Sequence, residues 1–71
     1  MKFSDKVYYL RKKKGLTQTE LAEKANVSQG LIWLFESGRR KPTKNTEIQL
    51  AKVLGVKVVD LMDDERSVVS E

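Results

Sequence analysis

Residues 16–38 contain the feature that most constrains the fold, two short helical segments separated by only three residues. Thr17 and Glu20 have the spacing of a capping box, in which each side chain bonds the other residue's backbone at a helix start. Ser28 is a favourable cap for the second segment, and Gly38 ends it where a left-handed backbone is commonly required. Because so short a connection holds two helices at a steep angle, these residues predict a helix-turn-helix.

Apolar spacing and glycine stops predict three further helices and no strand in the rest of the chain. The expected helices cover residues 5–14, 18–25, 29–37, 44–54 and 58–62. Ser4 and Thr43 are the expected caps of the first and fourth helices. The fold class is therefore all-α, a compact five-helix bundle in residues 1–62. Residues 63–71 are acidic and have no helical period, so we expect a frayed tail there.

The composition excludes several classes of protein. The 71-residue chain has neither cysteine nor histidine, so it lacks disulfides, cysteine-based zinc sites and the commonest general base. Its apolar runs fall well short of the ~20 residues that cross a bilayer, and its N-terminus lacks the apolar core of a signal peptide. We therefore expect a cytoplasmic protein that is not an enzyme, holds no metal or cofactor and contacts no membrane.

The net charge of +4 is unevenly distributed along the chain. Residues 1–44 carry eleven cationic and four anionic side chains, whereas residues 45–71 carry three cationic and six anionic ones. The first part should attract a polyanion, and the second should not. Charged residues are mostly exposed in any protein, so this composition alone is equally compatible with an ordinary solvated surface.

Several motifs keep a common register along the chain. They are Leu10-Arg11, Gly15-Leu16-Thr17-Gln18, Leu21-Ala22, Val27-Ser28, Ile32, Glu36, Gly38, Pro42 and Leu50-Ala51. Together they resemble the lambda-repressor-like (Cro-type, XRE) helix-turn-helix family over most of the chain. The resemblance implies a lambda-repressor-like bundle and a DNA-binding transcriptional regulator, a small repressor of phage, mobile-element or bacterial type. It also implies that the helix at residues 29–37 enters the major groove of double-stranded DNA.

The resemblance and the chemistry of the side chains together assign candidate DNA contacts. Gln29 begins the recognition helix, where its amide can pair in bidentate fashion with adenine, while Leu34 can pack on a thymine methyl. The base-contacting candidates are Gln29, Gly30, Leu34 and Ser37. Thr17 and Gln18 lie at a helix start, whose free N–H groups suit a phosphate. The resemblance implies that Gln18 also braces the start of the recognition helix. The phosphate-contacting candidates are Thr17, Gln18, Arg39, Arg40, Lys41 and Lys44.

Arg11 and Glu36 match family positions with a structural role. In the family these positions form an ion pair between the first and third helices. The pair would orient the recognition helix rather than contact the ligand. Removing one partner of such a pair costs about 3–5 kcal/mol when the pair is buried.

The recognition helix departs from the family pattern because it is strongly apolar. Leu31, Trp33 and Leu34 stand where relatives commonly carry polar side chains, and Trp33 lies opposite the core-facing side. An exposed apolar strip also marks a protein partner. The alternative function is therefore a modulator or antirepressor that binds a partner protein, such as another repressor, through this face. With DNA as the ligand, Trp33→Ser should preserve or improve duplex binding.

Apolar residues near the C-terminal end of the domain have two possible uses. They are Val56, Val58, Val59, Leu61 and Met62. Family members of this size usually dimerise through this part, so the resemblance implies a homodimer on DNA. The same residues could instead complete the core of the monomer.

Overall fold

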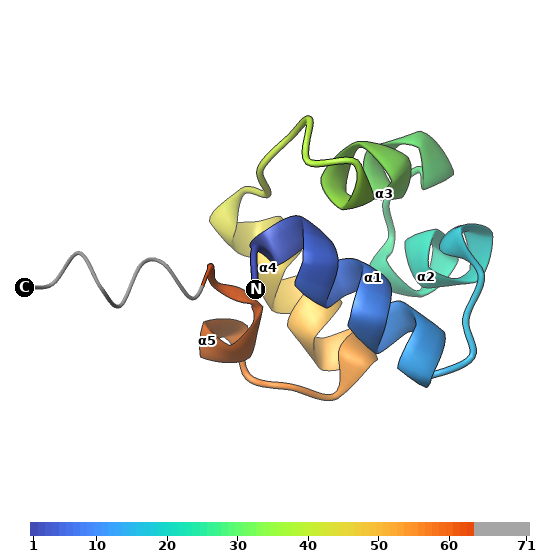
Figure 1. Cartoon of the computed structure of the whole chain (residues 1–71). Helices are drawn as coiled ribbons and strands as arrows, with labels where there is room; N and C mark the ends of the chain where they lie inside the picture. Colours follow the sequence, from blue (N-terminus) through green and yellow to red (C-terminus); the bar gives the residue numbers. More distant parts are fainter. Residues whose placement is uncertain (64–71) are drawn as a thin grey trace, which may run out of the picture.

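The computed structural model describes residues 1–63, which form five helices and no strand (Figure 1). The helices are α1 (Phe3–Lys13), α2 (Gln18–Ala25), α3 (Gln29–Glu36), α4 (Lys44–Leu54) and α5 (Val58–Leu61). The expected all-α bundle is confirmed, and each helix lies within two residues of its predicted bounds. Apart from Asp63, the predicted tail lies outside the described residues.

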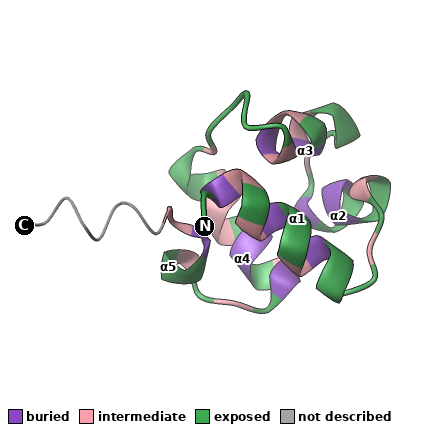
Figure 2. Cartoon of the chain, viewed as in Figure 1, coloured by how far each residue is buried: buried purple, intermediate pink, exposed green. Residues whose placement is uncertain are grey.

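One apolar core joins all five helices (Figure 2). The helix α3 packs against α1 and α2, α2 also packs against α4, and α5 closes the bundle against α1 and α4. The largest fully buried side chains are Val7, Leu21, Ile32, Phe35, Leu50 and Leu61. The Phe3 ring meets the Phe35 ring edge to face, with centroids 5.5 Å apart. Burying each such side chain stabilises the fold by about 1.5–3 kcal/mol, so these contacts fix where α3 lies.

Local hydrogen bonds define the helix-turn-helix. The Glu20 N–H donates to Thr17 Oγ1 (3.0 Å), and the Thr17 N–H donates to Glu20 Oε1 (2.8 Å), which confirms the predicted capping box. Asn26 then ends α2 in the left-handed region at φ +60°. Ser28 caps α3 as expected, because its hydroxyl oxygen accepts from the Leu31 N–H at 3.1 Å. The sharp turn between α2 and α3 therefore follows from these local interactions.

The predicted cap of the first helix is wrong. The helix α1 begins at Phe3, before Ser4, and its N-cap Lys2 makes no side-chain cap hydrogen bond. Instead, the Phe3 N–H donates to the carboxylate of Asp63, 60 residues away in sequence. Lys6 reinforces this contact by donating from Nζ to the Met62 carbonyl oxygen at 2.6 Å. The two ends of the described chain are therefore joined, and Asp63 packs with the domain.

The apolar residues near α5 divide between the two uses left open by the sequence. Leu61 is fully buried, and Val56 and Val58 pack partly against the core. Val59 points outward and is 61% exposed. Most of this segment therefore completes the monomer, and Val59 is the large apolar residue of α5 that remains accessible.

Candidate functional site

The helix α3 lies at one edge of the bundle beside the loop that follows it (Figure 1). Its inner side is formed by Ile32 and Phe35, which are 0% and 1% exposed. Its outer side carries the exposed residues Gln29, Gly30, Trp33 and Ser37. A Cβ added at Gly30 would meet nothing within 4 Å, so packing does not require a glycine there. The outer side of α3 is therefore open to solvent at Gly30, in the first turn of the helix.

The apolar strip on α3 is smaller than the sequence predicts. Leu31 is half-buried and packs against the core, and Leu34 is also half-buried. Trp33 is 47% exposed, which confirms the predicted orientation of its ring. The Ser37 hydroxyl donates to the Leu34 carbonyl oxygen at 3.1 Å, so the oxygen of this side chain remains available as an acceptor. Trp33 is thus the main apolar group that α3 exposes.

A buried ion pair fixes α3 against α1. Arg11 Nε lies 2.6 Å from Glu36 Oε2, Arg11 Nη2 lies 3.0 Å from Glu36 Oε1, and the two side chains are 8% and 6% exposed. Arg11 Nη1 also donates to the Leu16 carbonyl oxygen at 2.8 Å. The hydrogen bond to Glu36 raises the pKa of Arg11, although burial alone would lower it. The structure therefore contains the interhelical pair expected at these positions.

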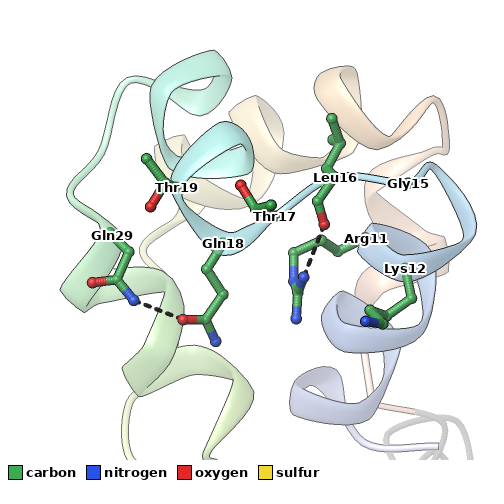
Figure 3. A pocket seen from close by; sticks show the side chains of 8 residues that line it. All are labelled: Arg11, Lys12, Gly15, Leu16, Thr17, Gln18, Thr19 and Gln29. Carbon is green, nitrogen blue, oxygen red and sulfur yellow. Dashed lines mark hydrogen bonds between the residues drawn. The ribbon is translucent and has the colours of Figure 1, made fainter.

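Two glutamine side chains extend this pair toward the surface. Gln18 Nε2 donates to Glu36 Oε1 at 3.0 Å, and Gln29 Nε2 donates to Gln18 Oε1 at 2.6 Å (Figure 3). A carboxylate can only accept, so Gln18 must turn its NH₂ group toward Glu36 and its oxygen toward Gln29. Gln29 then keeps one amide N–H and its carbonyl oxygen for a ligand. This bond braces the start of α3, as the family resemblance implies for Gln18.

A surface hollow of about 450 Å³ opens at the N-terminus of α2 (Figure 3). It is lined by Arg11, Lys12, Gly15, Leu16, Thr17, Gln18, Thr19 and Gln29. The N–H groups of Gln18 and Thr19 are in the first helical turn and have no intrahelical partner. Lys12, in the last turn of α1, adds a cation. Free N–H groups beside a cation favour an anion such as phosphate.

Residues 38–44, here called the basic loop, lie at the other end of α3. Gly38 adopts φ +76°, and the Arg39 N–H donates to the Leu34 carbonyl oxygen at 2.9 Å, which turns the chain back along α3. The exposed cations of the loop are Arg39, Arg40, Lys41 and Lys44. Lys41 Nζ lies 3.5 Å from Asp63 Oδ2 but remains 83% exposed. The predicted cations therefore lie on the segment that leads from the end of α3 into the first residue of α4.

Two groups of anion-binding character thus flank α3. The hollow at α2 adjoins Gln29 at the start of α3, and the basic loop begins at its end. At 1.5 Å per residue, the 8 residues of α3 span about 12 Å. This length is close to the width of the DNA major groove, about 12 Å, whose edges carry phosphates.

The described part of the chain lacks a metal-binding cluster and a membrane-spanning helix. Within residues 1–63, no group of three or more His, Cys, Asp or Glu side chains could hold a metal ion. None of the described helices is long and apolar enough to span a bilayer.

Comparisons with known proteins cover the whole candidate site. A family model described as Helix-turn-helix matches residues 7–61. An uncharacterised HTH-type transcriptional regulator of Sinorhizobium fredii is 45% identical over 53 residues, which are 75% of this chain and 69% of the relative. The transcriptional repressor RstR of the cryptic phage CTXphi in Vibrio cholerae is 32% identical over 69 residues, which are 97% of this chain and 62% of RstR. The crystal structure of SinR, the master regulator for biofilm formation, in complex with DNA matches with a TM-score of 0.82 and 31% identity, covering 86% of this chain and 98% of the SinR chain in that crystal.

Proposed function

Because this chain belongs to the helix-turn-helix family of DNA-binding transcriptional regulators, we propose that it inserts α3 into the major groove and acts as a repressor. The observation that carries the groove assignment is the pair of anion-binding groups at the two ends of α3. Phosphate contacts at both ends would set the depth and direction of the helix, and base contacts would come from its outer side. The relative from phage CTXphi is a repressor, which supports repression as the direction of control.

Gln29 is the principal base-contacting residue in this proposal. Its bond to Gln18 uses one N–H and leaves the other N–H and the carbonyl oxygen for a ligand. That pair of groups matches adenine, which offers N7 as acceptor and N6–H as donor. Gly30 lets the helix approach the base edges closely, Leu34 would contact a thymine methyl, and Ser37 would offer an acceptor.

The phosphate contacts come from two segments. At the hollow, the N–H groups of the first α2 turn, with Thr17, Gln18 and Lys12 around them, would hold one phosphate. At the other end of α3, the cations of the basic loop would hold the next accessible phosphates. These contacts supply affinity without sequence information, so they position α3 for its base contacts.

We further propose that the protein binds its operator as a homodimer and acts in the cytoplasm. The exposed Val59 on α5 is available for a subunit contact that leaves α3 free. A two-fold dimer would place its two recognition helices about 34–36 Å apart along the DNA, on an inverted repeat.

The partner-protein alternative has less support in the structure. The apolar face that would bind a partner consists of Leu31, Trp33 and Leu34, but Leu31 and Leu34 are half-buried. The Trp33 ring is partly covered as well, because the Arg39 guanidinium carbon lies 5.4 Å from its centroid. The exposed apolar surface of α3 is therefore too limited to favour a protein ligand over DNA.

The test is a mobility-shift titration of a random-sequence duplex at several salt concentrations. We expect affinity to fall steeply with salt, and Arg40→Ala to lower the slope of log affinity against log salt by about 1. Lys52→Ala is the matched control, because it removes an exposed cation at the opposite end of α4 from the basic loop. The control should leave the slope unchanged. Absence of duplex binding at low salt would overturn the proposed function.

A further inference from the structure

The proposed DNA contacts leave one prominent side chain of α3 without a role. Trp33 is the single tryptophan of the chain and is 47% exposed. It lies on the outer side of α3, in the region that would face the groove. A large ring there offers no hydrogen-bond acceptor and only one donor, so it is poorly suited to distinguishing base pairs.

The structure places a cation on this ring. The Arg39 guanidinium carbon lies 5.4 Å from the Trp33 ring centroid, within the range of a cation–π interaction. The backbone brings the two side chains together, because Gly38 reverses the chain and the Arg39 N–H returns to the Leu34 carbonyl oxygen at 2.9 Å. Arg39 therefore lies against the Trp33 ring at the end of α3 while it remains exposed to solvent.

We infer that Trp33 is a positioning residue for Arg39, which it holds in place to contact a DNA phosphate at the end of α3. This inference rests on the proposed function. A cation–π contact uses the flat face of the guanidinium and leaves the N–H groups at its edge free for bidentate bonding to a phosphate. In the described chain, the neighbouring Arg40 has no such ring beneath it, so it provides an internal comparison.

The contact between Trp33 and Arg39 would strengthen DNA binding because it holds the Arg39 side chain in place before binding. An arginine side chain on the surface loses rotamer freedom when it binds, and the loss is smaller if the side chain is already held in place. For one such side chain the effect corresponds to about a three- to tenfold change in affinity. Trp33→Ser should therefore weaken duplex binding, which is the opposite of what the sequence alone predicts.

The test is a double-variant cycle on a duplex selected from a random pool. Trp33→Leu should lower affinity about three- to tenfold and should leave the salt slope unchanged, because Arg39 keeps its charge. In an Arg39→Ala background, Trp33→Leu should have no further effect, whereas in an Arg40→Ala background it should have its full effect. Trp33→Phe keeps an aromatic face and should retain most of the wild-type affinity. If Trp33→Leu lowered duplex affinity equally in the Arg39→Ala and Arg40→Ala backgrounds, the inference would be overturned.

A second measurement examines the contact without DNA. Emission from Trp33 should be quenched more strongly by acrylamide in Arg39→Ala than in the wild type, because the guanidinium no longer covers the ring. Arg40→Ala should match the wild type. Equal quenching in all three proteins would overturn the inference, whatever the duplex results. Wild-type protein that binds no duplex would instead refute the proposed function, so the two failures are distinguishable.

Discussion

Glu36→Gln tests how much the buried ion pair between α1 and α3 contributes to the stability of the domain. The substitution keeps the size of the side chain and removes its charge. Glu36 accepts from Arg11 at 2.6 and 3.0 Å and from Gln18 at 3.0 Å, so three hydrogen bonds lose a charged acceptor. Arg11 is left with an uncompensated charge at a side-chain exposure of 8%.

The expected loss of unfolding free energy follows from the burial of the Arg11–Glu36 pair. Removing one partner of a buried ion pair costs about 3–5 kcal/mol. We place this variant near the lower limit, roughly 3 kcal/mol, since Arg11 keeps its bond to the Leu16 carbonyl oxygen and the new amide oxygen still accepts. For a domain of this size, 1 kcal/mol shifts the melting temperature by about 4–8 °C, so we expect a fall of roughly 12–24 °C.

The assay is thermal and urea unfolding followed by the helical circular dichroism signal. Glu23→Gln is the matched control, because Glu23 is an exposed carboxylate on α2 and its loss should change stability by less than about 0.5 kcal/mol. Replacing both partners, with Arg11→Met and Glu36→Leu, should recover much of the lost stability, because no buried charge remains. A destabilisation by Glu36→Gln of less than about 1 kcal/mol would refute the reasoning, since it would mean that the pair is effectively solvated.

Three further predictions concern other parts of the molecule. Gln29→Ala should cost about 1–3 kcal/mol on the preferred duplex and relax selection at one base pair in a binding-site selection, whereas an equal loss on all sequences would mean that Gln29 only positions α3. Asp63→Ala removes the cap of α1 and should lower the urea-unfolding free energy by about 0.5–2 kcal/mol; an unchanged value would show that water replaces the carboxylate without loss. Selected duplexes should contain an inverted repeat with half-site centres about 34–36 Å apart, and a site without a dyad would contradict the proposed homodimer.

The sequence predicted the features that depend on neighbouring residues. The capping box of Thr17 and Glu20 and the cap at Ser28 involve residues three positions apart, so their spacing alone identifies them. The outward direction of Trp33 likewise follows from the helical period once Ile32 and Phe35 mark the core. The pairing of distant side chains on α1 and α3 could be expected only through the family resemblance.

Features that depend on the arrangement of helices do not follow from local patterns. The hydrogen bond between Gln18 and Gln29, which only the family resemblance indicates, requires the crossing of α2 and α3 that brings their first turns together. The contact between Arg39 and Trp33 depends on the direction in which the chain leaves Gly38. Ser4 is a favourable cap residue near the start of α1, but the carboxylate that caps α1 comes from the other end of the domain. No local pattern contains that information.

Asp63, which caps the start of α1, is synthesised much later than α1 itself. Ribosomes make a chain from its N-terminus at about 5–20 residues per second, so the α1 segment precedes its capping residue by several seconds. During that interval the first N–H groups of α1 must be satisfied by water. The bundle can close at this point only after Asp63 has left the ribosome, so a nascent chain that stalls before Asp63 cannot join its two ends.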